Sequence, residues 1–292
     1  MKLDMPDIIS LYNDSVYKNL KIIDKIIISD MGLNDPYLME LFNKTLQTSK
    51  NELIEKWRSG KKYLRTLTAI KAFPDYSLDS LNLSISIDAI INILDDLLDE
   101  NLEKQAKTFY IVEIIRTLAN YHYQKSNKAL RHCIGNYFNK CIMIALLEKH
   151  FYDLLRNTKE NDYILKYPTY IYDIRSLDID VFVEIHLLAS NTIQFKDDII
   201  KVARTYRALE LIKKDILDVE HDVDNGIDTI FTILWNRKND LLKSVNNLIE
   251  LYLNRAGKIK CSKHSNIVID NFILMSENEV NNIRKYTKKY IM

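Results

Sequence analysis

Three aspartates, Asp95, Asp96 and Asp99, stand in a strongly apolar segment, residues 85–98. At about 100° per residue, an α-helix would gather them and Asp88 on one stripe and leave isoleucine and leucine in nearly every other direction. A helix that is apolar almost all round is buried, so the acidic stripe must face something inside the protein. Buried carboxylates need a counter-charge. Oxygen ligands without a nearby His or Cys favour Mg²⁺, with Mn²⁺ as the second choice.

A second acidic set follows later in the chain. Asp215, Asp218 and Asp222 stand at i, i+3 and i+7, and a continuous helix would place them within about 60° of each other. Mg²⁺ held by one or two carboxylates usually completes its coordination with phosphate oxygens. Two acidic helix faces could therefore hold metal ions on either side of one diphosphate group.

These motifs and their order resemble the trans-isoprenyl diphosphate synthases of the class I terpenoid synthase superfamily. Residues 95–99, Asp-Asp-Leu-Leu-Asp, are similar to the first aspartate-rich motif, and residues 214–222 are similar to the second, with Lys214 in place of its first aspartate. Residues 59–65 are similar to the segment whose Lys and Arg bind isopentenyl diphosphate. That likeness assigns the substrate diphosphate to Lys61, Lys62 and Arg65.

The resemblance implies an isoprenoid synthase fold: an all-α, single-domain bundle of about ten or more helices around a deep central cavity, spanning residues 1–292. It implies Mg²⁺-dependent ionisation of an allylic prenyl diphosphate, with about three ions and with Asp95, Asp96 and Asp99 as the catalytic ligands. Prenyl transfer to isopentenyl diphosphate would follow. By family analogy the enzyme is a homodimer. The residues assigned to the pocket that sets chain length are Ile87, Ile90 and Ile91.

Departures from the family pattern leave other class I activities open. The pair of arginines expected after the first motif is absent, and Lys104 and Lys107 are the only cations there. Arg175, followed three residues later by Asp178, is similar to the diphosphate sensor of terpene cyclases, so a cyclase acting on a C15–C25 prenyl diphosphate is one alternative. In that reading Arg175 and Lys214 contact the substrate. A prenyltransferase to a non-isoprenoid acceptor, such as a pheromone peptide, is another.

Composition favours a large helical core. The chain has 292 residues, is 47% hydrophobic, and contains only 5 Gly and 4 Pro to interrupt helices. Polar connections are expected at residues 71–81 and 157–168, and a loop over the site at 222–228. Helical periodicity predicts helices at residues 11–28, 37–57, 111–123, 137–155, 181–190, 199–222 and 241–256.

Charge and targeting signals narrow the other classes. The 41 basic and 40 acidic residues give a net charge of +1 without a long basic block, which disfavours nucleic acid as a partner. No apolar run approaches the roughly 20 residues of a transmembrane helix, and three Cys without metal-ligand spacing favour free thiols in the cytoplasm. Two non-enzymatic alternatives are a partner subunit of a heteromeric prenyl synthase and a helical scaffold protein.

Overall fold

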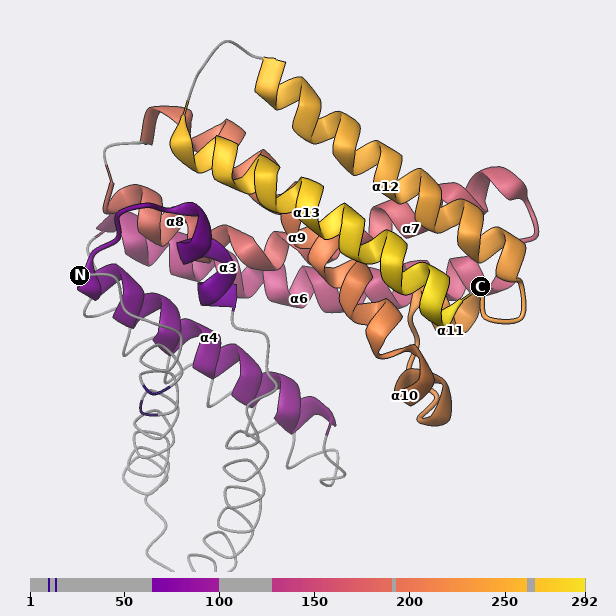
Figure 1. The fold of residues 1–292 in the computed structure, drawn as a ribbon. Helices are drawn as coiled ribbons and strands as arrows, with labels where there is room; N and C mark the ends of the chain where they lie inside the picture. Colours follow the sequence, from indigo (N-terminus) through magenta and orange to yellow (C-terminus); the bar gives the residue numbers. More distant parts are fainter. Residues whose placement is uncertain are drawn as a thin grey trace, which may run out of the picture. The chain divides into compact units, whose positions relative to one another are not determined.

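The computed structural model describes residues 10, 14, 65–99, 128–190, 193–261 and 266–291. Within these ranges the chain is helical and contains no β-strand, which confirms the all-α prediction (Figure 1). The α-helices in these ranges are α3 (Arg65–Ala72), α4 (Leu78–Asp99), α6 (Lys128–Asn157), α7 (Asn161–Arg175), α8 (Asp180–Leu188), α9 (Lys196–Leu217), α10 (Val219–Asp224), α11 (Ile230–Ile233), α12 (Lys238–Cys261) and α13 (Ile267–Tyr290). Two 3₁₀ turns, η1 (Ser176–Ile179) and η2 (Ile193–Phe195), lie among them.

Contacts divide the chain into two compact units. The first comprises Met1–Leu67 and Ser77–Ile134, and it contains α4. The second comprises Thr68–Tyr76 and Gly135–Met292, and it contains α7 to α13. The two aspartate-rich segments belong to different units.

In the first unit, the buried Asp88 of α4 binds the amino-terminal end of α3. Its carboxylate accepts a hydrogen bond from the Thr66 backbone N–H at 2.9 Å, and Arg65 NH1 lies 3.3 Å from its other oxygen. A carboxylate is stabilised at a helix N-terminus because the first backbone N–H groups there have no partner within the helix. Burial nevertheless raises the pKa of Asp88, and Arg65 and the Thr66 backbone only partly offset it. One acid of the predicted stripe thus joins two helices.

The second unit is built around α9. The helix begins after Phe195 with two acids in its first turn, Asp197 and Asp198, which suit the positive end of the helix dipole. From there almost every residue between Val202 and Ile212 is buried, because α13 and α12 both pack along α9 (Figure 1). The core that forms around its carboxyl half includes large buried side chains from α7, α11, α12 and α13: Tyr172, Phe231, Tyr252 and Ile283.

Helix α7 corrects one prediction. Residues 157–168 were expected to be a polar connection, but the helix begins at Asn161 and continues through Pro168. Proline has no N–H and leaves the carbonyl four residues earlier without its helical donor. That carbonyl, Ile164 O, instead accepts a hydrogen bond of 2.9 Å from the buried hydroxyl of Ser244 on α12. A contact from a distant helix therefore lets α7 accommodate its proline.

The predicted helix over residues 199–222 is interrupted once. The α-helix ends at Leu217, Asp218 forms a bend, and α10 continues from Val219 to Asp224. Beyond it, Gly226 has a φ of +65°, the left-handed conformation that glycine adopts at low cost. The loop expected at residues 222–228 is thus confirmed only after Asp224.

Other predicted elements agree with the structure where they can be compared. The helices predicted at residues 137–155 and 241–256 lie inside α6 and α12, and that at 181–190 matches α8. The connection predicted at 71–81 is confirmed but shorter, since α3 ends at Ala72 and α4 begins at Leu78. The predicted helices at 37–57 and 111–123 lie outside the described residues, as does that at 11–28 apart from Asp14. No helix in the described ranges is long and apolar enough to cross a lipid bilayer.

Candidate functional site

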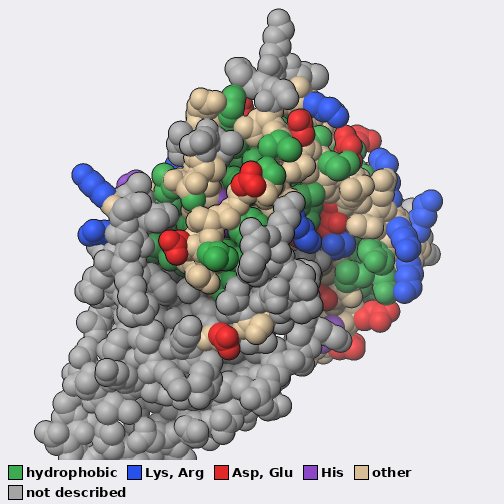
Figure 2. All heavy atoms as spheres, turned by 60° about the vertical axis from the view of Figure 1, so that its left-hand side comes forward, with side chains coloured by type: hydrophobic (Ala, Val, Ile, Leu, Met, Phe, Trp, Pro, Cys, Tyr) green, Lys and Arg blue, Asp and Glu red, His purple; other side chains and the backbone are tan. Residues whose placement is uncertain are grey.

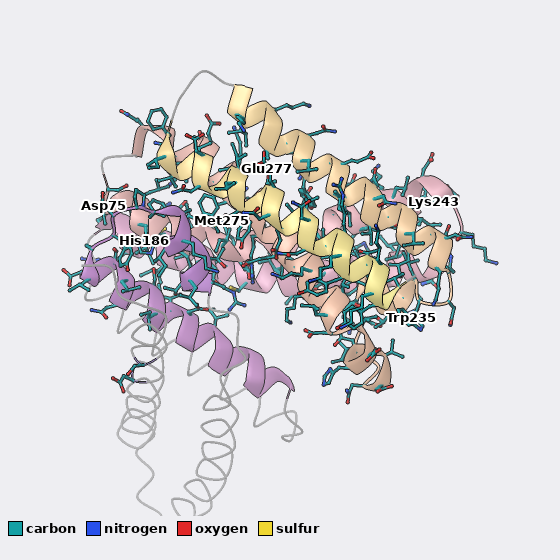
Figure 3. All side chains as sticks on the ribbon, in the orientation of Figure 1. Asp75, His186, Trp235, Lys243, Met275 and Glu277 are labelled. Atoms are coloured by element: carbon teal, nitrogen blue, oxygen red, sulfur yellow. The ribbon has the colours of Figure 1, made fainter. Side chains whose placement is uncertain are left out.

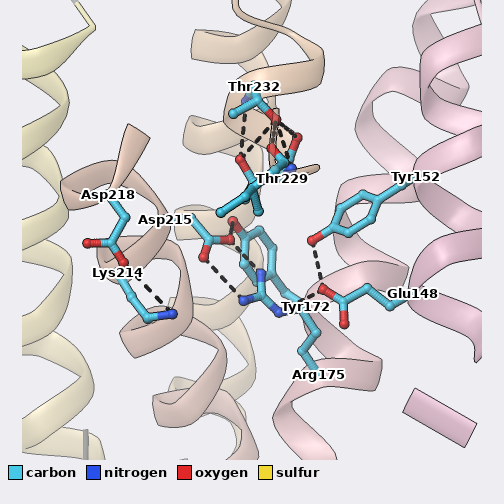
Figure 4. A network of polar contacts seen from close by, with 10 residues as sticks. Glu148, Tyr152, Tyr172, Arg175, Lys214, Asp215, Asp218, Thr229 and Thr232 are labelled. Carbon is cyan, nitrogen blue, oxygen red and sulfur yellow. Dashed lines mark hydrogen bonds and ion pairs between the residues drawn. The ribbon is translucent and has the colours of Figure 1, made fainter. Parts of the chain in front are cut away.

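A row of five polar side chains crosses three helices of the second unit, with Arg175 at its centre (Figure 4). The guanidinium NH1 and NH2 donate to the two oxygens of Asp215 on α9, at 2.5 and 3.2 Å. Its Nε lies 3.3 Å from Glu148 Oε1 on α6. A tyrosine supports each carboxylate, because Tyr172 donates to Asp215 at 2.9 Å and Tyr152 donates to Glu148 at 2.8 Å.

Burial makes this row electrostatically strong. The side chain of Asp215 is 3% exposed and that of Arg175 is 14% exposed. Burial by itself lowers the pKa of Arg175, but the charge of Asp215, with further contributions from Tyr152 and Glu148, outweighs it and holds the pKa well above its ordinary value. Burial also raises the pKa of both tyrosines well above the ordinary value, so their hydroxyls stay protonated and act as donors.

Further charges continue from Asp215 along the chain. Lys214 and Asp218 are about half exposed, and Lys214 Nζ lies 3.8 Å from the Asp218 carboxylate. Asp222 is largely buried, 3.4 Å from His221 Nδ1. Burial raises the pKa of Asp222, and the negative charges of Asp215 and Asp218 raise it further. The acids of the second motif therefore repel one another, although the bend at Asp218 leaves this residue more exposed than the other two.

The charges in this region do not balance. Among the described side chains of this group, the carboxylates of Glu148, Asp215, Asp218 and Asp222 outnumber the cations of Arg175 and Lys214, and His221 lies beside Asp222. A site with such an excess attracts metal ions and would bind an anionic ligand only together with them.

Carboxylate oxygens suit a hard metal ion, but the described side chains do not form a complete protein coordination shell. Within the described ranges, no three acidic, histidine or cysteine side chains are arranged so that they could hold one metal ion. Asp215 already has both oxygens bound to Arg175, which leaves Asp218 and Asp222 as the more accessible carboxylates. One or two carboxylates are the usual protein contribution to an Mg²⁺ ion that also binds phosphate oxygens, and these residues fit that arrangement.

The first motif is described only in its backbone. Asp95, Asp96 and Asp99 lie in α4 as predicted, and their side chains lie outside the described part, as does that of Ile90. Ile87 and Ile91 are both buried.

The predicted isopentenyl-binding segment is described at one residue. Lys61 and Lys62 lie outside the described residues. Arg65 lies inside them and contacts the buried Asp88. At least part of its charge therefore serves the junction of α3 and α4.

Arg175 and Asp178, the two residues similar to the diphosphate sensor of terpene cyclases, have different ion-pair partners. Asp178 accepts two hydrogen bonds from Arg207 of α9, at 2.9 and 2.7 Å. Arg175, one turn earlier, is bound instead to Asp215 and Glu148. Similar bridges join Asp173 to Arg255 and Asp180 to Arg204, so acids of α7, η1 and α8 repeatedly bind cations of α9 and α12.

Three members of the row were missed by the sequence analysis: Glu148, Tyr152 and Tyr172. A signal for the first two is present, because Glu148 and Tyr152 fall on the same helical stripe as Ile144 and Leu155 within the predicted helix 137–155. A single acid on an apolar stripe calls for a buried partner. Tyr172 offered no such signal, because no helix was predicted over α7.

Other titratable groups lie away from this row. His186 is buried against the rings of Phe73 and Tyr76, and burial lowers its pKa to about 4. Figure 3 places it at the opposite end of the second unit from Trp235. On the described part of the face in Figure 2, acidic, basic and apolar side chains are interspersed, in keeping with a net charge of +1.

Comparisons with known proteins add no identification. No protein family model matches the chain, and no curated protein or solved structure is detectably similar to it. The resemblance to class I isoprenoid enzymes therefore rests on the sequence motifs alone.

Proposed function

We propose that this protein is a class I isoprenoid enzyme that adopts the isoprenoid synthase fold and ionises an allylic prenyl diphosphate with Mg²⁺. The all-helical architecture and the first aspartate motif, carried on a helix, support the proposal. The observation that carries it is the charge imbalance around Arg175 and Asp215, which calls for a divalent cation and, through it, for a phosphate-bearing ligand.

In the second unit, Asp218 and Asp222 would hold Mg²⁺, with Asp215 behind them. By the resemblance, Asp95, Asp96 and Asp99 of the first motif would also be Mg²⁺ ligands. Bound Mg²⁺ neutralises the charge that develops on a departing diphosphate, which lowers the barrier to breaking the allylic C–O bond. Arg175 and Lys214 would supply N–H donors for the same group, and the two arginine amino groups could bind phosphate oxygens as a fork once the diphosphate replaces Asp215.

Two fates of the allylic cation follow from different residues. Transfer to isopentenyl diphosphate needs the cations of residues 59–65, where the contact of Arg65 with Asp88 leaves Lys61 and Lys62 as the principal diphosphate contacts. Internal capture by the substrate's own double bond needs none of them. The contact of Arg175 with the second motif favours internal capture, so a terpene cyclase is the second candidate.

Product analysis tests the proposal and separates the two fates. The purified chain is incubated with C10, C15 and C20 allylic diphosphates and Mg²⁺, with and without isopentenyl diphosphate, and the products are identified by mass spectrometry. Longer diphosphates that form only with isopentenyl diphosphate establish elongation. Hydrocarbons or alcohols formed without it establish a cyclase. No Mg²⁺-dependent consumption of any of them would refute the proposal.

A further inference from the structure

We infer that Glu148 is a positioning residue: it holds Arg175 by the Nε edge of the guanidinium and so directs the other two nitrogens at Asp215 of the second acidic set. This inference rests on the proposed function, because the ligand that it concerns is a diphosphate. No motif of the resemblance includes Glu148 or its supporting residue Tyr152.

The geometry separates the two edges of the guanidinium. Nε faces Glu148 on α6, whereas NH1 and NH2 face Asp215 on α9. Arginine carries five N–H donors in a rigid plane, so a carboxylate on one edge fixes the direction of the fork on the other. A diphosphate that takes the fork from Asp215 would leave the contact with Glu148 in place.

Glu148 is itself held in place. It lies one helical turn before Tyr152, whose hydroxyl donates to Oε1, the same oxygen that faces Arg175 Nε. Because burial raises the pKa of Tyr152, that donor is retained at neutral pH. The side chain of Glu148 is 26% exposed, and the pair of Glu148 and Tyr152 forms a fixed support on α6.

The charge of Glu148 also affects the ion pair between Arg175 and Asp215. With Glu148 present, Arg175 lies between two carboxylates. Its single positive charge is therefore shared between Glu148 and Asp215. Removal of the Glu148 charge would tighten the pair between Arg175 and Asp215 and make both less available to a metal diphosphate. Glu148 therefore acts on ligand binding through Arg175 rather than by touching the ligand.

Two measurements test this role with the Glu148→Gln variant, which keeps the side-chain shape, and with Tyr152→Phe. The control is Asp153→Asn, which removes an exposed charge from the same helix. The first measurement is the Kd for inorganic pyrophosphate with Mg²⁺ by calorimetry, in the wild type and in an Arg175→Lys background. The second is the solvent exchange rate of the Arg175 Nε proton by NMR on ¹⁵N-arginine-labelled protein.

We expect Glu148→Gln to weaken pyrophosphate binding about tenfold, because the charge that holds Nε is lost, and to accelerate Nε exchange. Tyr152→Phe should act in the same direction to a smaller extent, and Asp153→Asn should change neither quantity. In the Arg175→Lys background the effect of Glu148→Gln should fall below about twofold, because the two residues act as a unit.

An unchanged Kd together with unchanged Nε exchange in Glu148→Gln would overturn the inference, and so would an equal loss of affinity in both backgrounds. If the wild type binds no Mg²⁺ pyrophosphate, the proposed function fails. The exchange rate then decides by itself whether Glu148 holds Arg175.

Discussion

Arg175 at the end of α7 and Asp215 in the last turn of α9 form a two-bonded ion pair, at 2.5 and 3.2 Å, inside the second unit of the chain. Forty residues separate them in sequence, and the pair joins the residue that resembles a diphosphate sensor to the first intact acid of the second aspartate motif. Two residues assigned to one reaction on separate grounds are thus in direct contact.

Removal of Asp215 should strongly destabilise the protein. Asp215→Ala leaves the largely buried guanidinium of Arg175 with only Glu148, and loss of one partner of a buried pair costs about 3–5 kcal/mol. Asp218→Ala is the matched control, because its pair with Lys214 is half exposed and worth about 0–1 kcal/mol. Urea unfolding measures both values. Equal losses in the two variants would show that the pair with Arg175 contributes no more than a surface contact.

The proline of α7 offers a test of the fold alone. Ser244→Ala should cost about 1–3 kcal/mol, because Ile164 O becomes a buried acceptor without a donor. In a Pro168→Ala background the backbone N–H of residue 168 returns, and the cost of Ser244→Ala should fall to a few tenths of a kcal/mol. The measurement is a double-mutant cycle by urea unfolding. Equal costs in both backgrounds would mean that Ser244 does not compensate for the proline.

Two glycines should respond in opposite directions to alanine. Gly226→Ala should destabilise the protein by about 1–2 kcal/mol, because φ is +65° there and a Cβ disfavours this conformation. Gly257 lies inside α12 with no atom near an added Cβ, so Gly257→Ala should stabilise by about 0.5–1 kcal/mol. Thermal unfolding of the two variants compares them directly. A stabilising Gly226→Ala would contradict the assigned turn.

The buried His186 should make stability depend on pH. Its pKa is lowered by burial to about 4, whereas the unfolded chain titrates near the ordinary 6.5. Between these values the unfolded state binds a proton that the folded state does not. The free energy of unfolding should therefore fall as pH decreases from 6.5 to 4, by up to about 1.4 kcal/mol per pH unit.

His186→Phe should remove this contribution, whereas His150→Phe, at an exposed position, should retain it. Urea unfolding at several pH values between 4 and 7 compares the three slopes. A slope in His186→Phe equal to that of the wild type would exclude His186 as the source.

The sequence predicts some helices of this structure better than others. Strong helical periodicity located α6, α8, α9 and α12, because an apolar stripe is a property of the local sequence. Helix α7 was missed because its proline and polar start favour a loop, and only the hydroxyl of Ser244, 80 residues away, offsets that preference. The spacing of the second acidic set was read from the sequence, but the bend at Asp218 was not.

In the candidate site, too, the sequence predicts some residues and not others. Arg175, Lys214 and the acids Asp215, Asp218 and Asp222 could be found from motif spacing. Their partners could not, because an ion pair between α6, α7 and α9 depends on helix packing. Glu148 is the clearest case: its role becomes visible only when Arg175 is seen between two carboxylates.

The most direct test of the central claim is the release of pyrophosphate from a C15 allylic diphosphate by the purified chain, with and without Mg²⁺. The account predicts release that requires Mg²⁺ and that falls by at least about a hundredfold in Asp96→Asn, since removal of a group that stabilises transition-state charge costs about 10²–10³ in rate. Release that is independent of Mg²⁺, or that is unchanged in Asp96→Asn, would contradict it.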